Sequence, residues 1–186
     1  MQDRSTEGKP AIFLDRDGTI IEEAGYIGDI SLVEFFPFTV SVLREFQKHF
    51  LLFIVTNQSG VSKGLVTLRE VVSVNRYITD YLSAADINIE RVFCCIHRAE
   101  DNCRCRKPFP YFIRQAASEF NIDLGRSFII GDHPSDIECG INAGVTPLYL
   151  LSGHGEKHRK ELRPDVVVCS DLKAASGLII TKLNNN

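Results

Sequence analysis

Residues 11–19 read Ala11-Ile12-Phe13-Leu14-Asp15-Arg16-Asp17-Gly18-Thr19, so four apolar residues lead directly into two carboxylates. A short apolar run bounded by polar turn residues is typical of a buried strand. If the extended geometry continues past the strand, Asp15 and Asp17 project to the same side. Gly18 permits the sharp turn that follows. The stretch therefore predicts a strand that presents a pair of carboxylates at its carboxyl end.

The rest of the chain alternates short apolar runs with longer amphipathic ones. This alternation predicts an α/β fold, a Rossmann-like parallel sheet with helices on both faces. We expect strands at Ala11–Leu14, Leu51–Val55, Val92–Ile96, Ser127–Ile130, Thr146–Leu150 and Asp165–Val168. We expect helices at Thr39–Lys48, Leu68–Ala84, Pro110–Phe120, Pro134–Ala143, Gly155–Leu162 and Leu172–Leu183.

Two segments fit neither period. We expect residues 20–38 to form a small β-type flap, and residues 95–105 form a loop that carries cysteines. Both leave from the carboxyl ends of predicted strands, and Asp15, Thr56 and Asp132 lie at such ends too. Open α/β sheets bind their ligands at that edge. We therefore expect all 186 residues to form a single domain with its functional groups on one rim.

Composition excludes several classes of partner. The chain is 44% hydrophobic and 24% charged, which is ordinary for one soluble globular domain. A net charge of −3 argues against nucleic acid or anionic membranes as partners. The apolar stretch Phe50–Val55 is too short to span a bilayer, and Met1–Pro10 is polar, without a signal sequence. We expect a cytoplasmic monomer that acts on a small molecule.

The carboxylate pair suits phosphate chemistry. One carboxylate can attack phosphorus while the other protonates the leaving oxygen, and a bound dication offsets the repulsion between attacker and phosphate. Taken alone, the segment Asp15–Thr19 fits equally well an acidic turn that only ends a strand.

Three further segments separate these readings. Asp15-Arg16-Asp17-Gly18-Thr19 resembles the first signature motif of the haloacid dehalogenase superfamily of phosphatases. Ile54-Val55-Thr56-Asn57-Gln58-Ser59-Gly60 resembles the second motif, Arg106-Lys107-Pro108 the third, and Gly131-Asp132-His133-Pro134-Ser135-Asp136 the fourth. The four ordered matches cover about residues 11–150, so the resemblance implies a Mg²⁺-dependent phosphatase.

The resemblance also implies a role for each residue. Asp15 would be the nucleophile, and Asp17 would first protonate the leaving oxygen and then activate water. Thr56 and Lys107 would hold the oxygens of the transferring phosphoryl group. Asp15, Asp132 and the backbone carbonyl of Asp17 would bind Mg²⁺.

Plain structural roles stay open for some of these residues. Thr56 could cap a helix, and an isolated lysine such as Lys107 usually lies solvated on the surface. Asp136 fits two roles equally well. It could orient Lys107 or a metal-bound water, or it could cap the helix that follows.

The loop after the third predicted strand carries a possible metal site. Cys95, His97, Cys103 and Cys105 supply three thiolates and one imidazole within eleven positions. This ligand set suits tetrahedral Zn²⁺, and four protein ligands make the site structural. Its role would be to fix the loop that delivers Arg106 and Lys107.

Two other readings of this loop compete with zinc, a redox disulfide pair and unconnected thiols. We assign the remaining cysteines, Cys94, Cys139 and Cys169, to packing.

Within the superfamily the combination of motifs resembles the D-glycero-D-manno-heptose-1,7-bisphosphate 7-phosphatases. That resemblance implies a small phosphorylated sugar as substrate, with the stretch Glu23–Tyr26 and Arg106 in contact with it. The predicted substrate-binding residues are Glu23, Ala24, Gly25, Tyr26, Asn57, Gln58, Ser59, Arg106 and His133.

Two alternatives remain. The five residues between His97 and Cys103 look more like the related histidinol-phosphate phosphatases. A catalytically dead, zinc-stabilised interaction module is the alternative from another class, and the intact acidic, hydroxyl and lysine positions argue against it.

Overall fold

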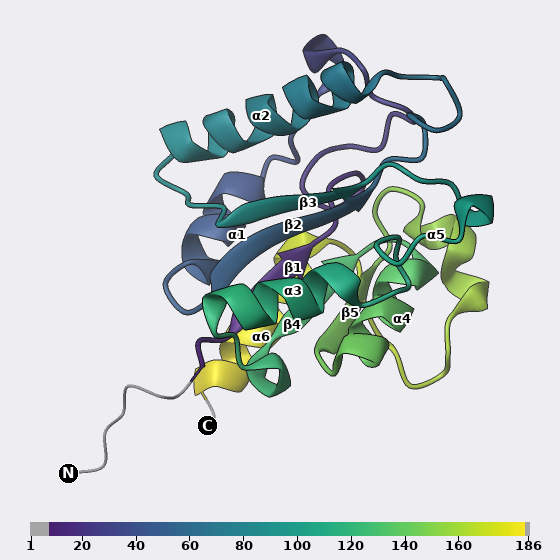
Figure 1. The fold of residues 1–186 in the computed structure, drawn as a ribbon. Coiled ribbons are helices and arrows are strands. Elements are labelled where there is room, and N and C mark those ends of the chain that lie inside the picture. Colours follow the sequence, from purple (N-terminus) through teal and green to yellow (C-terminus); the bar gives the residue numbers. More distant parts are fainter. Residues whose placement is uncertain (1–7, 185–186) are drawn as a thin grey trace.

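The computed structural model describes residues 8–184. Six parallel strands form one sheet in the order β3-β2-β1-β4-β5-β6 (Figure 1). In chain order the strands are β1 Ala11–Leu14, β2 Leu51–Asn57, β3 Arg91–Cys95, β4 Phe128–Gly131, β5 Thr146–Leu150 and β6 Val167–Cys169. The parallel sheet predicted from the alternation of apolar runs is confirmed.

The central strand β1 has a different neighbour on each side. Leu14 pairs with Ile54 of β2 on one side and with Ile130 of β4 on the other. The chain moves outward from β1 to β3 and then returns to β4 across β1. Such a change of direction opens a crevice at the carboxyl ends of the strands, which is where ligands bind in this architecture.

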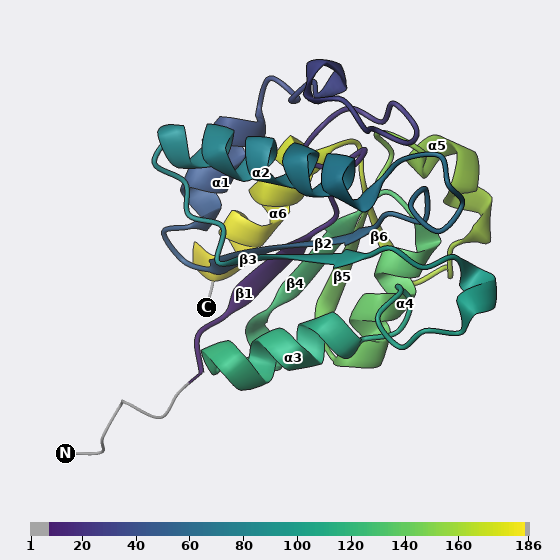
Figure 2. The same cartoon turned by 45° about the horizontal axis from the view of Figure 1, so that its top comes forward.

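Helices cover both faces of the sheet, as predicted. Figures 1 and 2 show α1, α2 and α6 on one face and α3 and α4 on the other. The bounds are α1 Thr39–Phe46, α2 Leu68–Ala84, α3 Tyr111–Phe120, α4 Pro134–Ala143, α5 Gly155–His158 and α6 Leu172–Asn184.

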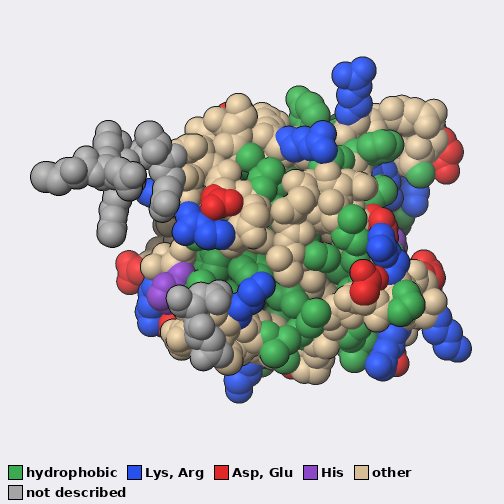
Figure 3. Space-filling view, turned by 90° about the horizontal axis from the view of Figure 1, so that it is seen from below, with side chains coloured by type: hydrophobic (Ala, Val, Ile, Leu, Met, Phe, Trp, Pro, Cys, Tyr) green, Lys and Arg blue, Asp and Glu red, His purple; other side chains and the backbone are tan. Residues whose placement is uncertain are grey.

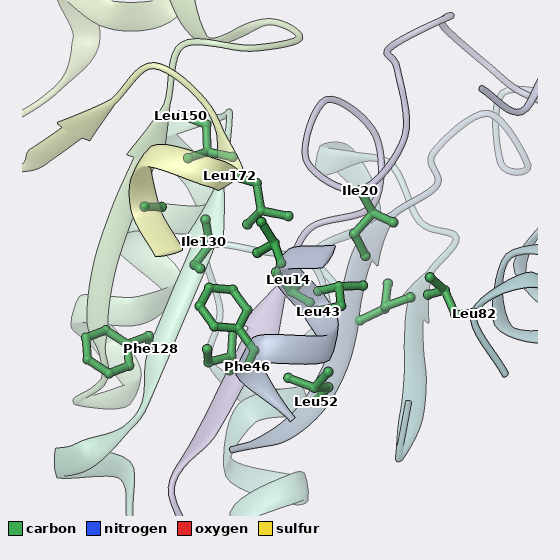
Figure 4. Packing of buried hydrophobic residues seen from close by; sticks show 14 of the residues in the cluster. Leu14, Ile20, Leu43, Phe46, Leu52, Leu82, Phe128, Ile130, Leu150 and Leu172 are labelled. Atoms are coloured by element: carbon green, nitrogen blue, oxygen red, sulfur yellow. The ribbon is translucent and has the colours of Figure 1, made fainter. Parts of the chain in front are cut away.

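Each face of the sheet has its own apolar core, because side chains of a strand alternate between the faces. Ile12 and Leu14 of β1 belong to the cluster under α1, α2 and α6, whereas Phe13 belongs to the cluster under α3 and α4. Figure 4 shows Leu43 and Phe46 of α1 within the first cluster. Burying a side chain of this size contributes about 1.5–3 kcal/mol, so both faces hold the sheet in place.

Local signals explain where helices begin and end. Thr67 Oγ1 accepts a hydrogen bond from the Glu70 backbone N–H at 3.2 Å, and the Glu70 carboxylate accepts from the Thr67 N–H at 2.6 Å. This capping box starts α2 at Leu68. At the C-terminal end of α4, Gly144 adopts a φ of +84° and terminates the helix.

The flap over residues 20–38 differs from its prediction in detail. It was expected to be β-type, but it contains only one antiparallel bridge, Ile21 with Phe35, and a 3₁₀ turn at Ile30–Leu32. Buried apolar side chains of the segment, such as Ile27, hold it down, and Thr39 Oγ1 donates a hydrogen bond to the Ile20 carbonyl at 2.7 Å. Packing therefore orders the flap without a ladder of strand hydrogen bonds.

Several element bounds also differ. The strand β2 continues through Asn57, so Thr56 lies inside it rather than just past its end. The predicted helix Gly155–Leu162 is a single α-turn followed by a 3₁₀ turn at Arg159–Glu161. The edge strand β6 begins at Val167 instead of Asp165. An edge strand is held from one side only, so its ends are weakly marked in sequence.

The surface agrees with the balanced composition. On the face drawn in Figure 3, Lys and Arg side chains are interspersed with Asp and Glu, and hydrophobic patches lie between them. Within residues 8–184, no helix combines the length and apolar character that a membrane span requires.

Candidate active site

Four predicted residues meet in one cavity at the carboxyl edge of the sheet. Asp15 follows β1, Thr56 lies near the end of β2, Asp132 follows β4, and Lys107 comes from the loop after β3. All four line a cavity of about 360 Å³. That volume lies within the range of small-molecule sites.

Lys107 is buried between carboxylates. Its Nζ lies 2.9 Å from Asp15 Oδ1 and 2.6 Å from Asp136 Oδ1, and it donates a hydrogen bond to the Val55 carbonyl at 2.7 Å. Burial alone would lower the pKa of Lys107, but the carboxylates of Asp136 and Asp15 raise it above its ordinary value. The side chain is therefore a fixed positive charge beside Asp15.

Asp136 performs both of the roles that the sequence left open. One carboxylate oxygen contacts Lys107, and the other accepts a hydrogen bond from the His133 backbone N–H at 3.0 Å. The second contact is half of a capping box at the start of α4. Asp136 therefore connects the position of Lys107 to a helix N-terminus.

Three carboxylates at the cavity form a candidate binding site for a cation. Asp15, Asp132 and Asp136 each offer an oxygen within 4.8 Å of the others. Burial, together with the charges of Asp15 and Asp136, raises the pKa of Asp132 to about 8. Burial also raises the pKa of Asp136. Carboxylates in this condition gain most from a hard divalent cation, and their oxygen donor set fits Mg²⁺.

Two loops close around Asp132. The His154 backbone N–H donates a hydrogen bond to Asp132 Oδ2 at 2.7 Å, and Ser152 Oγ donates to the Gly18 carbonyl at 2.6 Å. A Cβ on Gly18 would lie 2.1 Å from Asp132 Oδ2, and one on Gly153 would lie 2.2 Å from the same oxygen. Both positions also have positive φ angles, so glycine is required at each.

Asp17 is held from behind by its neighbour. Arg16 Nε donates to both Asp17 oxygens, at 3.1 and 3.0 Å, and Arg16 Nη2 donates to Oδ1 at 2.8 Å. Gln58 Nε2 donates to Asp17 Oδ2 at 2.7 Å and to Thr56 Oγ1 at 2.8 Å. Asp17, in the turn after β1, and Thr56 of β2 are thus connected through one amide.

The flap, the turn that carries Lys63 and the loop that carries Arg106 form the outer wall of the cavity. Glu23, Gly25 and Tyr26 of the flap line the cavity together with Lys63 and Arg106. Lys63 Nζ donates a hydrogen bond to the Tyr26 hydroxyl at 2.6 Å, and this contact is the main reason that the pKa of Tyr26 is lowered. Burial and the nearby Asp17 charge raise the pKa of Glu23. The wall therefore offers both basic and acidic groups.

The other predicted substrate contacts divide into two groups. Asn57, Gln58, Ser59 and His133 line the cavity. Ala24 is exposed and lies outside the cavity lining. The Asn57 amide also brackets the Lys107 backbone, accepting from its N–H at 3.1 Å and donating to its carbonyl at 3.2 Å.

The cysteine loop brings its four candidate ligands together. The Sγ atoms of Cys95, Cys103 and Cys105 lie 3.3–3.6 Å apart, and His97 Nδ1 lies 3.7 Å from Cys95 Sγ and 3.5 Å from Cys105 Sγ. Tetrahedral bonds of about 2.3 Å to one metal place sulfurs about 3.8 Å apart, close to these separations. Burial raises the pKa of Cys95 and Cys105, and a cation would offset that cost.

The cluster lies beside Lys107 in sequence and in space. Arg106 Nη1 donates a hydrogen bond to the His97 carbonyl at 3.1 Å, which connects the residue before Lys107 to the cysteine loop. Cys139 and Cys169 are buried outside the cluster, as predicted. Cys94 is partly buried and lies outside the cluster, as predicted.

Comparisons with known proteins identify the family. A HAD-hydrolase-like family model matches residues 104–175. The chain is 40% identical over 148 residues to the D-glycero-beta-D-manno-heptose-1,7-bisphosphate 7-phosphatase of Helicobacter pylori strain J99, covering 76% of this chain and 83% of that protein. The chain belongs to the heptose-bisphosphate phosphatase family of HAD-like hydrolases. It is therefore a phosphatase.

Other members of the heptose-bisphosphate phosphatase family extend the likeness. The D-glycero-alpha-D-manno-heptose-1,7-bisphosphate 7-phosphatase of Campylobacter jejuni is 35% identical over 143 residues, covering 76% of this chain and 82% of that protein. The crystal structure of the D,D-heptose 1,7-bisphosphate phosphatase from B. bronchiseptica, complexed with magnesium and phosphate, superposes with a TM-score of 0.85 at 26% identity. The match covers 93% of this chain and 99% of that one.

Several residues of this family member were missed by the sequence reasoning. Arg16 was quoted only as part of a motif, although its side chain is completely buried beside Asp17. Lys63 and His154 also line the cavity. A usable signal existed for His154, because it follows the predicted strand β5 on the rim where ligands bind. Lys63 lies in a turn whose position depends on the whole fold.

Proposed function

We propose that this phosphatase removes the 7-phosphate of D-glycero-D-manno-heptose 1,7-bisphosphate through an aspartyl-phosphate formed on Asp15. The observation that carries the proposal is the position of Asp15 in one cavity with Thr56, Lys107 and Asp132. The names of the relatives support the choice of sugar.

In the first step an Asp15 oxygen forms a bond to phosphorus while the bond from phosphorus to the sugar oxygen breaks. Lys107 Nζ lies 2.9 Å from Asp15 Oδ1. In that position it offsets the negative charge of the phosphoryl oxygens as Asp15 attacks. The Thr56 hydroxyl, on the same cavity wall, donates to a phosphoryl oxygen. Asp17 gives its proton to the departing sugar oxygen, which leaves as an alcohol.

In the second step water attacks the phosphorus of the aspartyl-phosphate. Asp17 takes a proton from that water, and the bond between phosphorus and the Asp15 oxygen breaks. Inorganic phosphate leaves, and both carboxyl groups return to their starting forms. The same side chain therefore serves as acid and then as base.

Asp15, Asp132 and the Asp17 carbonyl are the groups that would hold Mg²⁺. When bound, the ion supplies positive charge between the nucleophile and the phosphoryl oxygens. The raised pKa of Asp132 and the oxygen-only donor set support this assignment. For the second metal, three sulfurs and one imidazole at tetrahedral spacing support structural Zn²⁺.

We assign the phosphate that is not transferred to the outer wall, with Arg106 as its main ligand. Arg106 lines the cavity, and its planar guanidinium suits a phosphate. We also propose that the enzyme is a single domain that acts as a monomer, with every group named above supplied by one chain. The six cysteines form no disulfide among residues 8–184, which fits a reducing compartment such as the cytoplasm.

The test is a phosphate-release assay with Mg²⁺ on both anomers of heptose 1,7-bisphosphate and on histidinol phosphate. We expect the highest kcat/KM with one heptose anomer, and Asp15→Asn should lower turnover on the order of 10³-fold or more. Asp80→Asn, an exposed aspartate on α2, is the matched control and should keep wild-type turnover. A preference for histidinol phosphate would overturn the substrate, and full activity of Asp15→Asn would overturn the mechanism.

A further inference from the structure

The side chain of Arg16 is a completely buried cation that lies behind the cavity lining, next to Asp17. All three of its nitrogens are used. Nε and Nη2 donate to Asp17, and Nη1 donates to Asn75 Oδ1 at 2.8 Å. Arg16 does not line the cavity, so it can influence substrate only through the residue that it holds.

Asn75 connects this arrangement to a distant element. It lies in the middle of α2, 59 residues after Arg16. The neighbouring buried residues of α2, Val74 and Ile78, pack in the apolar core against the sheet. Because α2 is fixed by the core, Asn75 is a rigid acceptor that limits where the guanidinium can lie.

The two contacts on Asp17 differ in kind. The planar guanidinium of Arg16 donates to the Asp17 carboxylate through Nε and Nη2. This geometry fixes the plane of the carboxyl group as well as its distance from the guanidinium. Gln58 adds a single hydrogen bond from the side of Thr56. Asp17 itself is 13% exposed and faces the cavity. Its orientation is thus set by a group that never meets the substrate.

We propose that Arg16, braced by Asn75, is a positioning residue that aims the Asp17 carboxyl group at the leaving oxygen for proton transfer. The inference rests on the function proposed above. Proton transfer to a leaving group contributes on the order of 10²–10⁴-fold to a rate, and it requires the acid within hydrogen-bond reach. A small displacement of such a group can therefore cost on the order of 10²-fold.

The chemistry of the leaving group separates positioning from a merely structural role. A sugar alkoxide is a poor leaving group and needs a proton as the bond to phosphorus breaks. The p-nitrophenolate ion is stable and leaves with little help. Loss of a correctly placed acid must therefore slow the sugar ester much more than the aryl ester. Loss of folding or of phosphate binding slows both esters alike.

The experiment measures kcat and KM for heptose 1,7-bisphosphate and for p-nitrophenyl phosphate. For Arg16→Met we expect kcat on the sugar ester to fall on the order of 10²-fold and kcat on the aryl ester to fall less than about tenfold. KM should change little on either ester. Asn75→Leu should shift the ratio of the two kcat values in the same direction. Arg76→Met, one residue away on the exposed face of α2, is the matched control and should leave the ratio unchanged.

Two further variants sharpen the result. Arg16→Lys keeps the charge but loses the planar fork, so it should not restore the wild-type ratio. In an Asp17→Asn background, Arg16→Met should cause less than about a twofold further loss on the sugar ester, because the two residues act as one unit.

Each outcome decides the inference. Equal losses on both esters, or independent losses in the double variant, would overturn it. If Arg16→Met does not fold, Arg16→Lys and Asn75→Leu carry the test, and wild-type ratios in both would overturn it. Wild-type protein that releases phosphate from neither ester would refute the proposed function instead.

Discussion

Replacing Lys107 with methionine removes the positive charge from the centre of the acidic cluster. Methionine has a similar length and no charge, so the change leaves Asp15 and Asp136 facing each other without a cation. Lys107 is 2% exposed and makes two ion pairs, at 2.9 and 2.6 Å. Removing one partner of a buried pair costs about 3–5 kcal/mol, and we expect a loss of this size in the free energy of unfolding at pH 8.

The cost should depend on pH, with a sign that follows from the carboxylates. Asp136 already has a raised pKa, and losing Lys107, which lowers it, raises it further. A group with a raised folded-state pKa stabilises the fold below its unfolded-state value, and that contribution is lost as pH rises through the folded-state value. Near pH 5 the carboxyl group binds a proton, so the variant should lose only about 1–3 kcal/mol, the cost of unpaired polar groups.

Urea unfolding followed by circular dichroism measures both values. The buffer should lack added Mg²⁺, which would replace the missing charge, and should contain no chelator, which would remove the zinc proposed for the cysteine loop. Lys173→Met, an exposed lysine on α6, is the control and should change stability by less than about 0.5 kcal/mol. A loss below about 1 kcal/mol for Lys107→Met at pH 8, or an equal loss at both pH values, would refute the reasoning.

Three further predictions test the metals and the close packing around them. Cys105→Ser should lower kcat by about tenfold or more with little change in helix content, because the loop that delivers Lys107 loses its anchor; full activity in protein shown to lack the metal by elemental analysis would contradict this. Mg²⁺ should raise the Tm more at pH 8 than at pH 6, because burial raises the pKa of Asp132 to about 8 and protons compete with the ion below that pH; an equal shift at both pH values would contradict it. Gly153→Ala should destabilise the fold by about 1–3 kcal/mol and weaken Mg²⁺ binding in calorimetry, since its Cβ would lie 2.2 Å from Asp132 Oδ2. Gly177→Ala in α6, where no atom lies within 4 Å of the added Cβ, should instead stabilise the fold in the same thermal melts.

The parts of the fold that sequence predicts well are those with strong local patterns. The apolar run Ala11–Leu14 is buried along its whole length, and its register with β2 and β4 places Asp15 at the rim. Because ligands bind at the carboxyl edge of such sheets, Thr56 and Asp132 are predicted to lie near Asp15, and they line the same cavity. These inferences need only the strand pattern and the chain order.

Other features depend on contacts between distant segments. A buried arginine and an exposed one look the same in sequence, and the burial of Arg16 depends on Asn75, 59 residues away. The flap was predicted to be β-type but has little regular β-structure, because packing, rather than periodic hydrogen bonding, orders it. The bounds of β6 were wrong because an edge strand with exposed residues such as Val167 has little pattern.

The separation between the sheet edge and the flap has a consequence for how new specificities arise. The candidate catalytic residues Asp15, Thr56 and Asp132 lie at or beside strand ends. The cavity wall that includes Glu23 and Tyr26 belongs instead to residues 20–38, a segment with one internal antiparallel bridge. Insertions or exchanges within residues 20–38 would leave the sheet's hydrogen bonds intact. Natural variation or engineering could therefore redirect this scaffold to another phosphate ester by changing the exposed residues of this segment, while its buried residues and the residues at the strand ends stay the same.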